Sequence, residues 1–593
     1  MKLRLILLPV LLFLAFTFLV PLNLWNNSGQ AAWLLLVPLL LFLLLVGLLR
    51  LAVWGGSAGF MEIIKGQSLT EDKPLREDIS IRGGDAGSSY AVQLFVDLDK
   101  PAAVVSESYL SFAIDTSQVV GGKWWHPSGN RREFGSGTVS TPLFDFDRPK
   151  LDLLTSALAP AYLRIGGSEA DKVYYDLNTD EDARTDIPPG FDSVLKRKQW
   201  QTIHSFVDRN HLKLVFTLNT GPGNRNDYGK WDPGNARELM AHTAKRGFPV
   251  EVWEFGNEMN VFFSVFGFRE QVPVDRYCQD LRAARQLVTK YFPKSMLAGQ
   301  GSAYWPVLGE PLGFFFGYMP EYLEKAGDML DLVTWHYYPQ QSRRGAFASR
   351  RATPSRLLDP RYLDEAAYWA DKIAEVRHRY ASNKPLWLGE TGNAQFGGEP
   401  GVSDVYIGGL WWLDQLGLMA RHAHDVVVRQ SLTGMNYGLI DEDGLVPRPD
   451  YWNSLLWKRL MGRRVYEPQI DGENVARLRV YAHASAVDEH EFVTILAINL
   501  DHQRDAVLSF PGFPNSGYEL YAITAPDVLG TSILLNGKPL VLVSDETLPE
   551  INAERYEPSA VPEVTINPLS YAFIRFPHKM SPHHSRRRRR TRA

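Results

Sequence analysis

Short apolar segments alternate with longer amphipathic segments through the middle of the chain. Stretches such as 274–292 and 362–381 place apolar residues at helical spacing, and the short segments between such stretches have the pattern of buried strands. This alternation predicts an α/β fold, a parallel sheet closed into a (β/α)8 TIM barrel over residues 109–460, with an open doubly wound sheet as the alternative. The eight expected strands lie in 108–115, 161–167, 212–220, 250–257, 296–301, 332–338, 384–390 and 425–432.

The pattern changes after the barrel. Residues 461–578 alternate apolar and polar positions in short runs that Pro, Gly and Asn separate, which is typical of a C-terminal antiparallel β-sandwich. One earlier segment, within 90–108, has the same alternation before the barrel begins. We expect this segment to join the sandwich.

The formal net charge of −4 hides an uneven distribution. The last residues, 579–593, are strongly basic and predict a disordered tail, so the folded body is acidic. The tail offers its arginines to anionic lipid or acidic glycan, and a purely solvated tail is the alternative. It is also the one feature that favours nucleic acid, which we do not expect as a partner. No phosphate-binding glycine loop opens a helix and no Cys/His cluster has zinc spacing, so neither a cofactor nor a metal is expected.

Two of the predicted strands end in carboxylates. WEFGNEMN at 253–260 contains Glu258, and LWLGETGN at 386–393 contains Glu390. Because the carboxyl ends of barrel strands meet on one face, we expect these acids to lie close together. Such a pair suits retaining glycoside hydrolysis, in which one carboxyl group is a protonated acid/base and the other an ionised nucleophile.

Polar neighbours of the two acids have roles in the same hypothesis. Asn257 would bind the sugar 2-hydroxyl, a contact that strengthens in the transition state. His336 and Tyr338, at the end of a third strand, would keep the nucleophile ionised by hydrogen bonding. Glu254, two residues before the end of its strand, is interpreted as a structural ion-pair partner.

The two acid motifs resemble those of glycoside hydrolase family 79, the heparanase and β-glucuronidase family. The resemblance runs in the same order from about Phe95 to Phe576, and APAYLRIGGSEAD, DLVTWHYY, PDYWNSLLWKRLMG and SDETLPE also carry it. It implies a double-displacement mechanism with retention, with Glu258 as the general acid and then base and Glu390 as the nucleophile.

The resemblance also implies how the substrate is bound. The family contacts the glucuronate carboxylate through a tyrosine hydroxyl and the backbone amides of a glycine-rich loop. The matching residues here are Tyr437, Gly397 and Gly398, while Asp115 and Arg343 match further cleft positions.

The chain departs from heparanase in this loop. Phe396 stands at the first of three consecutive glycines, and Glu399 follows the remaining two. A phenylalanine there would narrow the cleft or block an amide contact. The lysines that follow the heparanase acid/base motif are also missing, so highly sulfated heparan is not the expected substrate.

The first 54 residues are almost entirely apolar. Two runs, about 3–25 and 31–53, predict transmembrane segments and hence a membrane-anchored protein in contact with the lipid bilayer. A signal peptide followed by a buried helix is the alternative. The flanking lysines and arginines place both ends in the cytoplasm, whereas a glycan-cleaving enzyme would face outward, so the side of the membrane stays open. A polar linker at 55–89 follows.

The sequence thus predicts an endo- or exo-acting retaining hydrolase of β-linked glucuronic acid. Two alternatives remain: an exo-glycosidase for another β-sugar, and a catalytically silent, membrane-tethered glycan-binding protein. The pair of acids argues against the second, because a binding protein has little use for both.

Overall fold

The computed structural model describes residues 88–125, 138–177, 187–305, 318–345, 350–488 and 491–578. The predicted transmembrane segments, nearly all of the linker and the basic tail lie outside these ranges. None of the helices within them is both long enough and apolar enough to span a bilayer.

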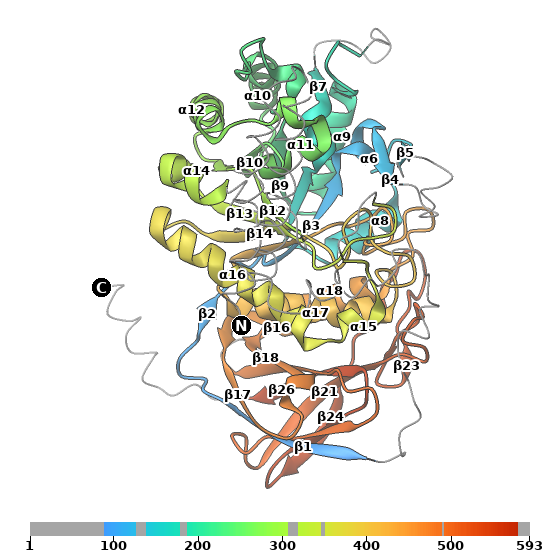
Figure 1. The fold of residues 1–593 in the computed structure, drawn as a ribbon. Helices are drawn as coiled ribbons and strands as arrows, with labels where there is room; N and C mark the ends of the chain where they lie inside the picture. Colours follow the sequence, from blue (N-terminus) through green and yellow to red (C-terminus); the bar gives the residue numbers. More distant parts are fainter. Residues whose placement is uncertain are drawn as a thin grey trace, which may run out of the picture. The chain divides into compact units, whose positions relative to one another are not determined.

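One all-parallel sheet forms the centre of the region that follows β1 (Ser89–Val96) and β2 (Ala103–Val104) (Figure 1). Neighbours in this sheet follow the order β11-β10-β9-β6-β3-β15-β14-β13-β12. The two ends of this order, β11 and β12, are two parts of one short stretch, and the bridges Ala298–Leu332 and Asn257–Gly301 tie that stretch to its neighbours on either side. The sheet therefore closes with eight strand positions, and these are the eight predicted strands. Their bounds are β3 (Leu110–Asp115), β6 (Tyr162–Gly166), β9 (Lys213–Leu218), β10 (Val252–Phe255), β11 (Met296–Ala298), β12 (Ser302–Tyr304), β13 (Val333–Tyr337), β14 (Leu386–Thr391) and β15 (Val426–Arg429).

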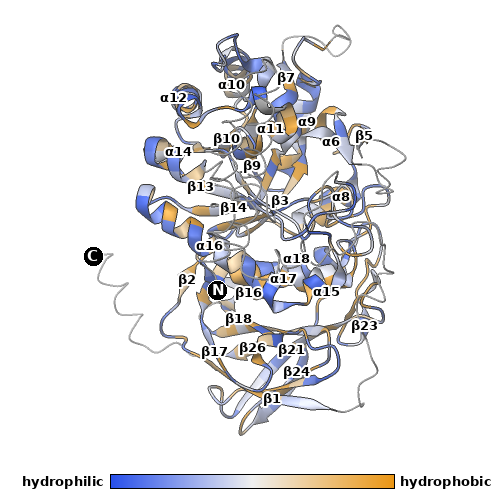
Figure 2. Cartoon of the chain, viewed as in Figure 1, coloured by the Kyte–Doolittle hydropathy of each residue, from blue (hydrophilic) through white to orange (hydrophobic). Residues whose placement is uncertain are grey.

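A helix follows each strand position, which completes the predicted (β/α)8 barrel. Figure 2 shows hydrophilic and hydrophobic residues along α14 and α16, as expected for helices with one face on a sheet. The bounds are α8 (Pro149–Ser156), α9 (Arg197–Arg209), α10 (Gly234–Arg246), α12 (Val274–Tyr291), α14 (Met319–Ala326), α16 (Pro360–Tyr380), α17 (Tyr406–Arg421) and α18 (Pro449–Leu460). Shorter elements in the loops include α6 (Thr116–Val120), β4 (Lys123–Trp125), β5 (Thr138–Ser140), β7 (Val173–Asp176), β8 (Ser193–Lys196), α11 (Phe263–Phe266) and α15 (Pro354–Leu357).

Two sheets form the sandwich, one in the order β17-β1-β20-β25 and the other β2-β16-β18-β19-β26-β21-β22-β23, with β24 beside β21. Apolar side chains from both sheets form its core, including Val92, Val480 and Leu508. The bounds are β1 (Ser89–Val96), β2 (Ala103–Val104), β16 (Met461–Tyr466), β17 (Pro468–Gly472), β18 (Leu478–Ser485), β19 (Phe492–Asn499), β20 (Asp505–Ser509), β21 (Ser516–Thr524), β22 (Leu534–Leu535), β23 (Lys538–Pro539), β24 (Glu554–Ser559), β25 (Glu563–Ile566) and β26 (Ser570–Pro577).

The strand expected from the segment before the barrel is β1. It pairs with β17 in antiparallel register and with β20 in parallel register. The prediction of a purely antiparallel sandwich was therefore wrong for this one pair. The physical reason is its origin: β1 reaches the sheet from the far end of the chain, and no hairpin turn fixes its direction.

Helix α17 joins the barrel to the sandwich. Every residue from Tyr406 to Ala420 is buried, which includes the carboxylate of Asp414. That carboxylate accepts hydrogen bonds from Arg479 (2.7 Å) and the Tyr481 hydroxyl (2.5 Å), both on β18. A second carboxylate, Asp364, pairs with the same arginine at 2.8 Å but is 57% exposed.

These two partners of Arg479 predict different effects on stability. We expect Asp414→Asn to lower the free energy of unfolding by about 3 kcal/mol, because it leaves the Arg479 charge, which is only 13% exposed, short of its main partner. Asp364→Asn should cost less than about 1 kcal/mol, because water screens an exposed pair. Urea unfolding of both variants measures the difference, and equal losses would contradict this account of the interface.

Candidate active site

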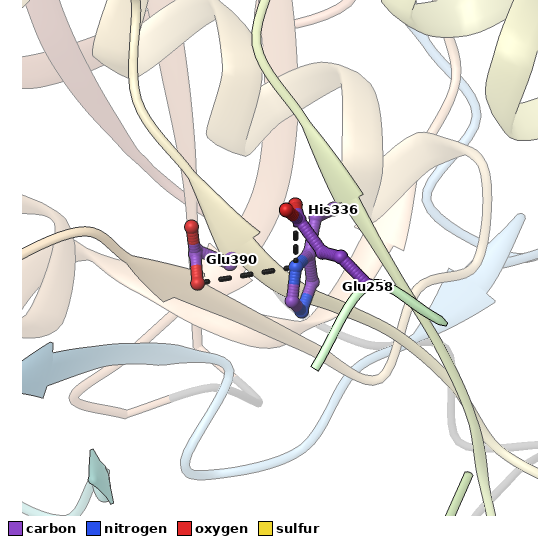
Figure 3. A group of neighbouring side chains, drawn as sticks. All are labelled: Glu258, His336 and Glu390. Atoms are coloured by element: carbon purple, nitrogen blue, oxygen red, sulfur yellow. Dashed lines mark hydrogen bonds and ion pairs between the residues drawn. The ribbon is translucent and has the colours of Figure 1, made fainter. Parts of the chain in front are cut away.

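The two acids predicted from the strand ends lie side by side. Glu390 lies on β14, and Glu258 follows β10 and begins a short 3-10 helix with a φ of +50°. Figure 3 shows His336 of β13 between the two carboxylates. A carboxylate oxygen of each acid and a ring nitrogen of His336 all lie within 4.8 Å of one another. All three residues are buried.

Glycines make this close approach possible. A Cβ at Gly301 would overlap the His336 ring, and one at Gly389 would overlap the Thr334 hydroxyl. Any larger residue at either position would displace the strand that carries a member of the site. The barrel therefore needs glycine where its strands bring the acids and the histidine together.

A buried arginine that sequence reasoning missed connects the site. Arg164 of β6 donates to Glu390 Oε2 at 2.7 Å, to Glu254 Oε2 at 2.9 Å and to Asn257 Oδ1 at 2.8 Å. Burial opposes its charge, but Glu254 and Glu390 outweigh burial and raise the pKa of Arg164. Glu254 is thus an ion-pair partner, as predicted. The signal in the sequence was a single charge within the apolar strand 161–167.

Different neighbours make the two carboxyl groups unlike. Burial raises the pKa of Glu390, but His336, Arg164 and a hydrogen bond from the Tyr338 hydroxyl (2.6 Å) outweigh burial and lower it below its usual value. Burial also raises the pKa of Glu258, the nearby charge of Glu390 adds to this, and the His336 hydrogen bond offsets it only in part. Glu258 is therefore suited to hold a proton and Glu390 to stay ionised.

His336 meets only part of its expected role. It helps to lower the pKa of Glu390, as expected, but its Nδ1 lies 3.1 Å from Glu258 Oε1 and 3.9 Å from Glu390 Oε2, so its hydrogen bond goes to Glu258 and not to Glu390. Tyr338 alone of the two donates to Glu390.

The same three side chains could in principle present ligand atoms to a metal ion. Both oxygens of Glu390 already accept hydrogen bonds, from Arg164 and Tyr338. A metal ion would have to approach beside the Arg164 cation, so the arrangement suits proton transfer better than metal binding.

Two further predicted residues are buried and hydrogen-bonded. Asp115 ends β3, accepts hydrogen bonds from the Ser117 amide (2.9 Å) and hydroxyl (2.8 Å), and burial raises its pKa to about 8. The Asn257 Oδ1 accepts a hydrogen bond from Arg164, which turns the Nδ2 donor of Asn257 away from the guanidinium. The backbone amide of Asn257 donates to Asp171 at 3.0 Å.

The predicted carboxylate-binding loop contacts the segment that carries Tyr437. Gly397 and Gly398 have φ values of +84° and +77°. The Gly398 amide donates to the Ala394 carbonyl at 3.2 Å, so only the Gly397 amide of this pair lacks a hydrogen bond among the described residues. Tyr437 is buried in an aromatic cluster with Tyr338.

The two adjacent arginines after β13 behave differently. Arg343, the predicted cleft residue, is 37% exposed, and its side chain donates to Glu399. Its backbone amide also donates to Glu399, at 2.8 Å. Arg344 is buried and donates to the Gly398 carbonyl and, at 2.5 Å, to Asn436. Sequence reasoning missed Arg344, since nothing in a pair of arginines tells which one the fold buries.

Comparisons with known proteins agree with this geometry. Residues 93–417 match the model described as glycosyl hydrolase family 79, N-terminal domain. Heparanase-like protein 1 of Arabidopsis thaliana is 33% identical over 404 residues, which are 65% of this chain and 70% of that protein. Heparanase of Gallus gallus is 28% identical, with 81% and 94% covered, and hyaluronoglucuronidase of Hirudo nipponia is 27% identical, with 82% and 97% covered.

Solved structures share the fold at low identity. The GH51 arabinofuranosidase from Xanthomonas axonopodis pv. citri aligns with a TM-score of 0.59 at 14% identity, covering 82% of this chain and all of that one. A 4-O-α-L-rhamnosyl-β-D-glucuronidase from Fusarium oxysporum 12S aligns with a TM-score of 0.55 at 13% identity, covering 82% and 99%. These likenesses show the fold alone. The family model spans more than half of the 593 residues, and on that ground the chain belongs to glycoside hydrolase family 79 and is a glycosidase.

Proposed function

We propose that the protein is a retaining β-glucuronidase that acts by double displacement on glucuronate-containing glycans. The observation that carries this proposal is the pair of buried carboxylates, Glu258 and Glu390, of which one oxygen each lies within 4.8 Å of the other. Retaining glycosidases hold their two carboxyl groups about 5–5.5 Å apart, whereas inverting enzymes leave about 6.5–9.5 Å for a water molecule.

In the first step Glu258 donates its proton to the glycosidic oxygen while Glu390 attacks the anomeric carbon. The leaving group departs with the proton, and a covalent glycosyl-enzyme ester forms on Glu390. In the second step Glu258, now ionised, takes a proton from water, and this water releases the sugar with its β configuration. The opposite pKa shifts of the two groups support these roles.

Neighbouring donors fit a glucuronate in this site. The Asn257 Nδ2, turned away from Arg164, is suited to bind the 2-hydroxyl. The Tyr437 hydroxyl and the Gly397 amide are suited to bind the carboxylate, a role that the resemblance also assigns to Gly398, whose amide is engaged with Ala394. Two relatives are named heparanase and hyaluronoglucuronidase, which supports a glycosaminoglycan containing glucuronate as the substrate.

The activity test uses p-nitrophenyl β-glucuronide beside the corresponding glucoside, galactoside and xyloside. We expect release from the glucuronide, and a loss of at least about 10³-fold in Glu390→Ala, which lacks the nucleophile. Glu258→Ala should regain activity with azide, because this anion attacks the glycosyl-enzyme in place of water, needs no general base, and releases the sugar as its β-azide. Nuclear magnetic resonance should show β-glucuronic acid as the first product.

Other outcomes would change the proposal in defined ways. Release from another glycoside alone would keep the mechanism and overturn the specificity. α-Glucuronic acid as the first product would overturn retention.

The pH dependence gives a second test. Activity needs Glu390 ionised and Glu258 protonated. We therefore expect kcat/KM to decrease when the pH is below the pKa of Glu390 and when the pH is above the pKa of Glu258. Tyr338→Phe removes a donor that lowers the pKa of Glu390, so the acidic limb should move to higher pH.

The matched control is Tyr337→Phe. Tyr337 is the last residue of β13 and the buried neighbour of Tyr338, and its hydroxyl makes no hydrogen bond among the described residues. Its variant should keep both limbs in place. Equal shifts in the two variants would contradict the role given to Tyr338.

A further inference from the structure

Phe396 has a backbone conformation that a phenylalanine rarely adopts. It lies six residues after Glu390 with a φ of +66°, and Gly397 and Gly398 continue at +84° and +77°. Three successive left-handed residues suit glycine, and a side chain with a Cβ is strained there. Contacts of the phenylalanine ring must therefore stabilise this conformation.

The ring contacts two other loops. It packs edge-on against Trp125, with ring centres 5.2 Å apart and planes at 63°. It also occupies the space beside Gly345, where a Cβ would overlap the ring. Trp125 belongs to β4, after the first barrel strand, and Gly345 follows β13. Phe396 thus joins three loops at the carboxyl end of the barrel.

Charged groups hold the same loops together. The Arg343–Glu399 pair and the Arg344 bond to the Gly398 carbonyl link the loop after β13 to the loop after β14. The Asn436 backbone amide donates to the Gly397 carbonyl at 2.9 Å, and this bond connects the loop after β15 to the other two loops. These contacts hold the loop that carries Phe396 in place against its two neighbouring loops.

The Phe396–Trp125 pair borders the proposed carboxylate-binding group. Trp125 packs against the aromatic cluster that contains Tyr338 and Tyr437, and a Cβ on Gly397 would lie 3.1 Å from Trp125. In a glucuronate the carboxylate carbon is attached to C5, next to C4. In a chain linked through O4, the preceding sugar would therefore extend from the side of the site where Phe396 and Trp125 meet.

We propose that Phe396 and Trp125 form a wall that closes the non-reducing side of the cleft and restricts cleavage to a terminal glucuronate. This inference rests on the proposed glucuronidase activity and adds that the enzyme removes glucuronate only from the non-reducing end of the glycan. The half-buried state of both rings fits a wall that faces the cleft. A clash built against one class of substrate is an ordinary source of specificity.

The test uses unsulfated oligosaccharides of alternating glucuronate and N-acetylglucosamine, in which glucuronate is linked through O4, with a fluorescent label at the reducing end. One series ends in glucuronate at the non-reducing end, and a second series is capped there by N-acetylglucosamine. We expect the wild-type protein to remove one glucuronate from the first series and to leave the capped series intact. Phe396→Gly should raise the ratio of capped-series to first-series cleavage at least about tenfold, because glycine removes the ring and relieves the positive φ.

Two further variants make the result specific. Trp125→Ala removes the other half of the wall and should raise the same ratio. Tyr228→Ala removes an 87% exposed aromatic ring from the loop after β9 and should leave the ratio unchanged. Thermal unfolding of each variant checks that it is folded.

The inference is overturned if the wild-type protein cuts the capped series internally as fast as it trims the first series. It is also overturned if folded Phe396→Gly leaves the ratio unchanged or lowers cleavage of both series, which would make the ring a binding platform instead. Hydrolysis of p-nitrophenyl β-glucuronide, measured in parallel, reports separately on the proposed function.

Discussion

The pairing of the buried Arg164 guanidinium shapes the active site. A cation inside the barrel is stable only if acceptors surround it, and Glu254, Asn257 and Glu390 provide them. The same requirement explains Gly166, because a Cβ there would lie 2.7 Å from the guanidinium carbon and 2.5 Å from the Thr217 hydroxyl. The charge of Arg164 thus holds side chains of β6, β10 and β14 together, and this sets the distances between the groups of the site.

This pairing also suits the chemistry of double displacement. In the proposed mechanism the two acids together carry one negative charge before the first step, on Glu390. After it they again carry one, on Glu258, because Glu390 has become an ester and Glu258 has lost its proton. His336 lies 3.1 Å from one acid and 3.9 Å from the other, so it contacts the charge in one state and remains near it in the other. The site therefore need not compensate a change in total charge while the bond breaks.

The sequence predicted the barrel and its two acids because both leave local signals. Strand and helix differ in period, and an acid at the end of an apolar strand is visible within eight residues. The pairings that Arg164 and Arg344 make left no such signal, because each pairing joins positions far apart in the chain. The same holds for the parallel pairing of β1 with β20, and for the hydrogen bond of His336 to Glu258 rather than to Glu390.

In the proposed mechanism, the division between strands and loops separates catalysis from substrate choice. Glu390 and Arg164 lie on strands of a closed sheet, where a shift of one residue would disturb the whole barrel. Phe396 lies on a loop whose conformation is strained, and it is held by Trp125 and by contacts between loops. Its ring contacts, with Trp125 and beside Gly345, lie outside the barrel strands, so we expect a change there to leave the acids in place. In the proposed mechanism the barrel accordingly determines how the glycosidic bond is broken, and the loops determine which bond in the glycan reaches it.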